Sequence, residues 1–170
     1  MESAISEFTA VDVPRLAQLI NKSNQFNLTT RRRTEAELQA IMNDANSVCF
    51  SVRLKDRFGD HGLISVLIAR KADAVMEIDT WLMSCRVLKR QVEDEVLNEL
   101  ARLAKSKGCT RLRGVYLPTP KNAMVLDFYP RMGFTPVPAD DAAREFDLEM
   151  DGFRPLPTKI KVTRRAYEPA

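Results

Sequence analysis

The sequence has 170 residues, enough for one domain with a sizeable core, and its 45% apolar and 29% charged residues are typical of a globular protein. Its formal net charge of +3 is too small to indicate a nucleic-acid partner, and no apolar run approaches the length of a membrane span. Three widely spaced cysteines and a single histidine exclude a zinc site of ordinary spacing. With no signal-peptide pattern in residues 1–16, we expect a cytoplasmic protein with reduced thiols, no metal and no membrane partner.

The first half of the chain predicts one strand, two helices and a three-stranded meander. Residues 3–9 alternate as a strand, and Asp12 is placed to cap a helix with Pro14 in its first turn. The amide-rich segment 23–31 has no regular period, which indicates a loop that carries functional groups. Thr34 to Glu37 is a capping box for a second helix. Three apolar runs joined by short turns predict antiparallel strands, over residues 47–54, over residues 63–69 and from residue 75 to an end at residues 84–86.

The second half alternates helices with strands. From Gln91 the apolar residues follow a helical period, and Lys107-Gly108 is typical of a helix end. The remaining patterns predict strands over 111–117 and 144–150 and a short helix over 121–132. We therefore expect an α/β protein, with one domain over residues 1–154 that has a mixed central sheet flanked by helices. The C-terminal tail, residues 155–170, contains an alternating Ile160 and Val162 that would suit one more strand.

The junction between the central strand and the next helix is the strongest chemical candidate. Cys85 ends the strand and is followed by Arg86, Lys89, Arg90 and a helix N-terminus. Cations and a helix N-terminus lower the pKa of a thiol and favour the thiolate, which can accept an acyl group and pass it on. The same groups suit a phosphate. The alternative is an ordinary connection with solvated cations, in which Cys85 is a small packing residue.

The segment NAMVLDFYPRMGF, residues 122–134, together with the order of elements, resembles the GNAT acyltransferases. The resemblance implies that Asn122 contacts the pantetheine arm of coenzyme A and that Tyr129 protonates the leaving thiolate. It also implies that the strand containing Trp81 diverges from the strand containing Leu112, which opens a wedge for that arm. The alternative for Tyr129 is a core tyrosine.

Residues 86–91 stand where the GNAT proteins have their pyrophosphate loop, but Lys89 and Gln91 replace both glycines of that motif. Those glycines let the backbone approach a phosphate closely, so their absence counts against tight binding of coenzyme A. A phosphopantetheine arm on a carrier protein has no pyrophosphate and needs less of this loop. We therefore expect coenzyme A to be retained weakly or not at all.

A closer resemblance, to the C-terminal GNAT-like half of FkbH-like proteins, covers about residues 13–135 and is carried by residues 24–32, 56–64, 81–88 and 118–122. Members of that family pair this half with an N-terminal HAD-type phosphatase half, and they make a glyceryl thioester on an acyl carrier protein for polyketide assembly. The phosphatase needs an Asp-x-Asp motif at a strand end. The aspartates of residues 73–79 lie inside a strand pattern, so we assign no phosphatase chemistry here.

Together, the residues and the resemblance predict a site and a function. The amide-rich loop is expected to contact substrate, although a loop bonded to itself would use the same residues. The expected catalytic residues are Cys85 and Tyr129, the expected residues for the pantetheine arm or coenzyme A are Leu82, Ser84, Arg86, Lys89, Arg90 and Asn122, and the expected substrate contacts are Asn24, Gln25, Asn27 and Arg31.

The predicted function is transfer of a glyceryl or similar acyl group to an acyl carrier protein, with a separate HAD-type phosphatase subunit as a further partner. Two alternatives remain. The first is a carrier-docking module without chemistry of its own. The second is a coenzyme-A-dependent N-acetyltransferase, against which the missing glycines count.

Overall fold

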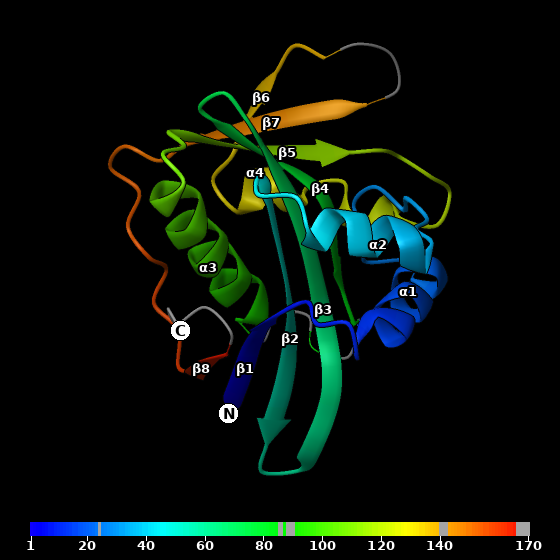
Figure 1. Cartoon of the computed structure of the whole chain (residues 1–170). Helices are drawn as coiled ribbons and strands as arrows, with labels where there is room; N and C mark the ends of the chain where they lie inside the picture. The colour runs from blue at the N-terminus through cyan, green and yellow to red at the C-terminus, as the bar shows by residue number, and fades with distance from the viewer. Residues whose placement is uncertain (24, 85–86, 88–90, 140–142, 166–170) are drawn as a thin grey trace.

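The computed structural model describes residues 1–23, 25–84, 87, 91–139 and 143–165. Among them, the strands form one mixed sheet in the order β6-β7-β5-β4-β3-β2-β1-β8, with helices on both sides (Figure 1). The strands are β1 (Glu2–Glu7), β2 (Ser47–Asp56), β3 (Gly59–Ala72), β4 (Val75–Met83), β5 (Arg111–Tyr116), β6 (Thr135–Val137), β7 (Arg144–Glu149) and β8 (Lys161–Arg165). The helices are α1 (Val13–Lys22), α2 (Glu35–Met42), α3 (Val92–Ser106), the short 3-10 helix η2 (Ala123–Val125) and α4 (Phe128–Arg131).

The predicted meander is present as β2, β3 and β4, which pair antiparallel in chain order. The predicted turn over residues 58–62 is shorter than expected, because β3 already begins at Gly59. Two aspartates hold this hairpin: the Asp56 carboxylate accepts from the N–H of Phe58 at 2.8 Å, and that of Asp60 accepts from Gly62 at 2.8 Å. Such local bonds let β2 and β3 extend beyond the other strands, as the lower part of Figure 1 shows.

Each face of the sheet has its own apolar cluster. On one face α1 and α2 bury Leu16, Ile20 and Leu38 against residues that include Val66 and Leu82. On the other face α3 and α4 pack on a larger cluster. Side chains that alternate along the strands therefore pack into both clusters, which is why the sequence of β3 is almost continuously apolar.

The helix predicted over residues 121–132 is broken in two, as η2 and α4. Pro130 lacks the N–H that would bond to the carbonyl of Leu126, so one helical hydrogen bond is missing at the break. The capping box predicted for α2 is confirmed: Glu37 N–H donates to Thr34 Oγ1 at 3.1 Å, and Thr34 N–H donates to Glu37 Oε1 at 3.0 Å. None of the helices in the described ranges is long and apolar enough to cross a membrane.

The C-terminal tail lies along α3 and then joins the sheet (Figure 1). Asn98 on α3 donates to the carbonyl of Leu156 at 2.9 Å and accepts from its N–H at 2.7 Å. β8 pairs parallel with β1, and Arg164 on β8 contacts the fully buried Glu99 of α3 at 2.7 Å. Residues 155–165 are thus packed on the same sheet and helix as the rest of the chain.

Gly114 on β5 lies against the ring of Tyr129, and a Cβ at this position would overlap the ring atoms. We expect Gly114→Ala to lower the free energy of unfolding by about 1–3 kcal/mol, since overpacking forces the ring or the strand to move. In a Tyr129→Leu background the added cost of Gly114→Ala should shrink. Urea unfolding of the four variants measures both quantities, and an equal cost in the two backgrounds would contradict this contact.

Candidate functional site

The predicted wedge is present between β4 and β5. These neighbours pair in parallel only from Val75 and Arg111 to Ile78 and Gly114. Beyond that point the two strands no longer bond to each other, and the aromatic ring of Tyr129 fills the space beside Gly114. The divergence of these strands therefore follows the prediction.

The wedge is filled by the chain itself. The segment Phe26–Thr29, called here the inserted segment, follows α1 and lies against β4, where Asn27 forms a bridge with Leu82. Leu28 N–H donates to the Trp81 carbonyl at 3.2 Å, and Met83 N–H donates to the Phe26 carbonyl at 3.1 Å. All four residues of the segment are at most 3% exposed.

On its other side the inserted segment bonds to the chain that continues β5. Leu117 N–H donates to the Leu28 carbonyl at 2.9 Å. The amide nitrogen of Asn122 donates to the carbonyls of Asn27 at 3.0 Å and Leu117 at 2.9 Å, while its oxygen accepts from Thr119 N–H at 2.7 Å. Asn122 is 0% exposed, and its amide is committed to the protein's own backbone. Asn122 therefore has a structural role, and its contact with the pantetheine arm stays a prediction from the sequence.

Asn27 is also committed to its own loop. Its side-chain oxygen accepts from Thr30 N–H at 2.9 Å and its nitrogen donates to the Ser23 carbonyl at 3.2 Å. These bonds fix a turn in which Thr30 has a φ of 51°, a left-handed conformation that a non-glycine residue rarely adopts. These contacts are those of a self-bonded loop, and the substrate contact of Asn27 stays a prediction from the sequence.

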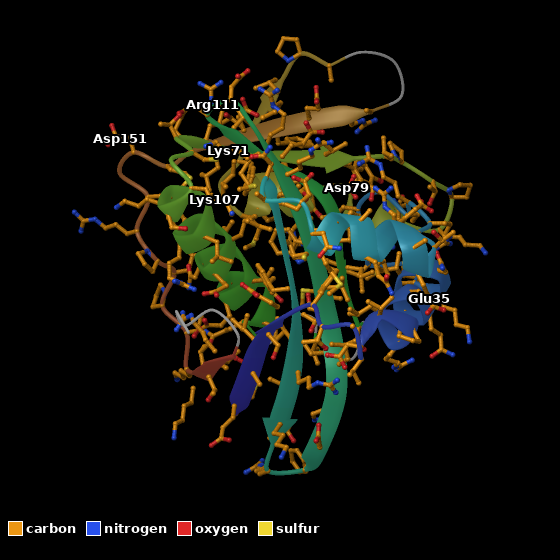
Figure 2. The ribbon with its side chains drawn as sticks, viewed as in Figure 1. Glu35, Lys71, Asp79, Lys107, Arg111 and Asp151 are labelled. Atoms are coloured by element: carbon orange, nitrogen blue, oxygen red, sulfur yellow. The ribbon has the colours of Figure 1, made fainter. Side chains whose placement is uncertain are left out.

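Arg31 and Arg33, which follow the inserted segment, both bind Asp79 on β4 (labelled in Figure 2). The nearest guanidinium-to-carboxylate distances are 2.6 Å for each arginine. Burial opposes ionisation of Asp79, but hydrogen bonds from Arg33 and Thr80 and the charges of both arginines outweigh it and lower the pKa of Asp79. Arg31 is therefore part of an ion-pair cluster with Asp79 and Arg33, and its predicted substrate contact stays a prediction.

Tyr129 is 1% exposed and lies in an aromatic cluster, with its ring centroid 5.6 Å from Phe128 and 5.0 Å from Phe134. Burial raises the pKa of its phenol above the usual range. A general acid has to come within hydrogen-bond reach of the atom that it protonates. The side chain is enclosed by β5 and by its aromatic neighbours, which is a packing role, and its part as proton donor stays a prediction.

A cavity of about 750 Å³ lies at the carboxyl end of β4, next to the inserted segment. We call it the β4-end cavity. Phe26 and Met83 contribute apolar walls, and Ser84 and Gln25, both predicted site residues, line it as well. Its lining also includes three basic residues from α1 and from the loop that follows β5, namely Arg15, Lys22 and Lys121.

A second hollow, the α3–α4 groove, has a volume of about 560 Å³ and includes Phe26 and Phe128 in its wall. Among the described residues its polar lining is mainly acidic: Glu93 and Asp94 come from the first turn of α3 and Asp127 from the start of α4, and Arg131 pairs with Asp127 at 3.3 Å. Glu95 adds a further acidic residue to that turn.

The first turn of α3 carries three acidic residues, Glu93, Asp94 and Glu95, whose charges oppose an anion at this helix end. Gln91, at the N-cap, has a φ of 70°, so the backbone keeps the left-handed conformation that a glycine of the GNAT motif supplies without strain. Residues 86 and 88–90 of the stretch that resembles the pyrophosphate loop lie outside the described residues, so weak retention of coenzyme A stays a prediction.

Several predicted site residues lie outside the described residues: Asn24, Cys85, Arg86, Lys89 and Arg90. Ser84, which directly precedes Cys85, donates its N–H to the Ile64 carbonyl at 2.7 Å and lines the β4-end cavity. Leu82 is fully buried in the cluster under α1, and its contribution at the wedge is through its backbone bridge to Asn27.

The other two cysteines are poor nucleophiles. Burial raises the pKa of Cys49 to about 11 and also raises that of Cys109. Cys109 is only 5% exposed and belongs to the core. Neither has the features that make a reactive thiolate.

Sequence reasoning missed Phe26, Arg33 and the basic lining of the β4-end cavity. One signal was available for Arg33: in an extended segment, residues two apart face the same side, so Arg31 and Arg33 would meet the same partner. Phe26 gave no comparable signal, because a single aromatic residue in a polar loop has no period.

The structure resembles solved acetyltransferases. The PaiA N-acetyltransferase from Thermoplasma acidophilum, in complex with coenzyme A, has a TM-score of 0.69 at 14% identity, covering 88% of this chain and 99% of that one. The GNAT domain of PAT from S. lividans has a TM-score of 0.67 at 14% identity, covering 85% and 89%. An aminoglycoside acetyltransferase in complex with coenzyme A has a TM-score of 0.61 at 17% identity, covering 89% and 97%.

The fold is therefore the GNAT acetyltransferase fold, as the order of elements predicts. No known protein family and no curated protein matches the sequence. The narrower resemblance to FkbH-like proteins stays a prediction from the sequence.

Asp79 offers a direct test of the ion-pair cluster. Asp79→Asn should lower the free energy of unfolding by about 2 kcal/mol at pH 7, because two partly buried arginines lose their acceptor. The folded pKa of Asp79 is lowered, so its stabilisation is complete above about pH 4, near the unfolded pKa, and is lost as pH falls through the folded value.

The difference between the wild type and Asp79→Asn should therefore narrow in acid, as urea unfolding at several pH values would show. The exposed turn residue Asp151 provides a matched control, since Asp151→Asn makes the same chemical change outside the cluster of Arg31, Arg33 and Asp79. Equal effects of the two substitutions would contradict a stabilising role for the cluster.

Proposed function

We propose that this chain is an acyltransferase that loads a glyceryl or similar acyl group onto the phosphopantetheine arm of an acyl carrier protein. The observation that carries the proposal is the β4-end cavity: it lies beside Ser84, the residue before Cys85, and basic residues line it. Apolar walls suit the arm, and the cations suit both its phosphate and the acidic surface of a carrier protein.

The proposed reaction is thioester exchange at Cys85. The Cys85 thiolate attacks the carbonyl carbon of an acyl phosphate donor, the acyl–sulfur bond forms, the acyl–oxygen bond breaks and phosphate departs. The arm's thiol gives up its proton and attacks this acyl group, the bond to Cys85 sulfur breaks, and the Cys85 thiolate returns. Both steps conserve oxidation state and need no metal. In the FkbH-like scheme, a separate HAD-type phosphatase would process the phosphorylated three-carbon donor.

A carrier protein fits this chain better than free coenzyme A. Coenzyme A would place its pyrophosphate near the first turn of α3, where Glu93, Asp94 and Glu95 supply negative charge. The arm of a carrier protein has one phosphate and no nucleotide, so it avoids that turn. The similarity to coenzyme-A-bound acetyltransferases supports a third reading, an N-acetyltransferase, but only at the level of the fold.

A carrier-docking module without chemistry is the second candidate. The observation that favours it is the occupation of the wedge by the inserted segment, together with the enclosure of Asn122 and Tyr129, the residues that resemble the GNAT machinery. Such a module would bind the carrier protein and leave group transfer to a separate partner.

Loading of a carrier protein distinguishes the two candidates. With a phosphoglyceryl donor, a HAD-type phosphatase and a holo carrier protein from a polyketide system, mass spectrometry should show a glyceryl adduct on the Cys85 peptide and then on the carrier. Limited iodoacetamide should label Cys85 before Cys49, because a pKa of about 11 keeps Cys49 protonated near neutral pH.

Cys85→Ser should abolish loading, while Cys49→Ser, the matched control, should leave it unchanged. Loading at the normal rate by Cys85→Ser would remove the nucleophile from the account and make the docking module the better explanation. Acetylation of amines from acetyl-coenzyme A without any carrier protein would favour the N-acetyltransferase instead.

A further inference from the structure

We infer that the inserted segment, Phe26–Thr29, stays bonded between β4 and the chain that continues β5 and closes the wedge, so that a thioester arm ends at Phe26 in the β4-end cavity instead of entering between β4 and β5. The inference about the arm rests on the proposed function, whereas the closure stands on the structure alone. Phe26 is the specificity-determining residue in this arrangement, because it lies where the arm would otherwise continue.

The first support is the bonding on both sides of the segment. Toward β4 it accepts from Met83 N–H and donates to the Trp81 carbonyl, and toward β5 it accepts from Leu117 N–H. These are the backbone groups that diverging strands leave without a strand partner. A pantetheine arm that used the same groups of β4 would have to displace Phe26 and Leu28.

The second support is the anchoring of the segment at its two ends. Asn122 holds the Asn27 carbonyl, and Thr29 Oγ1 donates to the Asp79 carbonyl at 2.9 Å. Directly beyond it, Arg31 and Arg33 bind the Asp79 carboxylate. The segment is thus tied to β4 at successive positions and cannot swing out as a hinged loop without losing these contacts together.

The third support is the position of Phe26. Its side chain lines both the β4-end cavity and the α3–α4 groove. Its ring also packs edge-on against Phe128, with 4.9 Å between the centroids. Phe26 therefore separates the two hollows, one with a basic and one with an acidic lining, and a ligand in one does not reach the other through the wedge.

Amide hydrogen exchange tests the closure through Leu28, Met83 and Leu117, whose N–H groups bond across the segment. We expect slow exchange at all three in the free protein, and no loss of protection when pantetheine, 4′-phosphopantetheine or acetyl-coenzyme A is added. Exchange as fast as that of an open loop, or faster exchange on adding any of these probes, would overturn the closure.

Asn122→Asp should speed exchange at these three amides at least about tenfold, because a carboxylate replaces both donors and faces the Asn27 and Leu117 carbonyls. Asn98→Asp is the matched control: Asn98 makes the same two-way amide contact with Leu156 on the far side of α3 and should leave the three rates unchanged. Thr29→Val, which removes only the hydroxyl bond to the Asp79 carbonyl, is the milder variant. It should raise the exchange rate of the Leu28 amide more than the rates of Met83 and Leu117.

Failure of the proposed function would look different from failure of the closure. If a holo carrier protein causes no change at Ser84 or Gln25 while the three amides stay protected, the carrier arm is excluded from the cavity and the closure is supported. If Asn122→Asp and Asn98→Asp change the three rates equally, Asn122 does not hold the segment and the closure as argued is overturned.

Discussion

The parting of β4 from β5 after Ile78 and Gly114 is the constraint on which the rest of the site depends. Buried backbone groups on diverging strands need hydrogen-bond partners, and this chain supplies them from its own inserted segment. The segment makes five hydrogen bonds, worth about 1 kcal/mol each, and burial of Phe26 and Leu28 contributes about 2 kcal/mol each. Together these contributions are comparable with the binding free energy of a micromolar ligand, roughly 8 kcal/mol. Loss of the arginine pairs with Asp79 would add to the cost of displacement.

This arrangement moves the candidate chemistry from the wedge to the carboxyl end of β4. Asn122 and Tyr129, which resemble GNAT functional residues, are occupied in holding and packing the segment and its surroundings. What remains accessible is a cavity with apolar walls and a basic lining beside Ser84. The same fold can thus keep the order of elements of an acetyltransferase while its ligand meets the sheet at a different place.

Patterns along the chain were sufficient for the meander, α3 and the capping box of α2, because each depends on local periodicity or on one short motif, whereas the divergence of β4 from β5 followed from the resemblance to the GNAT proteins. The site was harder. The bond between Asn122 and Asn27 joins residues 95 positions apart, and an amide side chain serves a ligand or a backbone carbonyl equally well. The sequence around Arg31 likewise does not indicate that its guanidinium pairs with Asp79, 48 positions along the chain. Only the three-dimensional contacts distinguish these uses.

The central claim is that a carrier-bound arm occupies the β4-end cavity while the wedge stays closed. The most direct measurement is an NMR titration of the labelled protein with the holo and apo forms of one carrier protein, which differ only in the arm. The account predicts that the amides of Gln25, Ser84 and Lys121 respond to the holo form more than to the apo form, and that those of Leu28 and Leu117 do not. Identical responses to the two forms, or a shift at Leu28 and Leu117 caused by the arm, would contradict it.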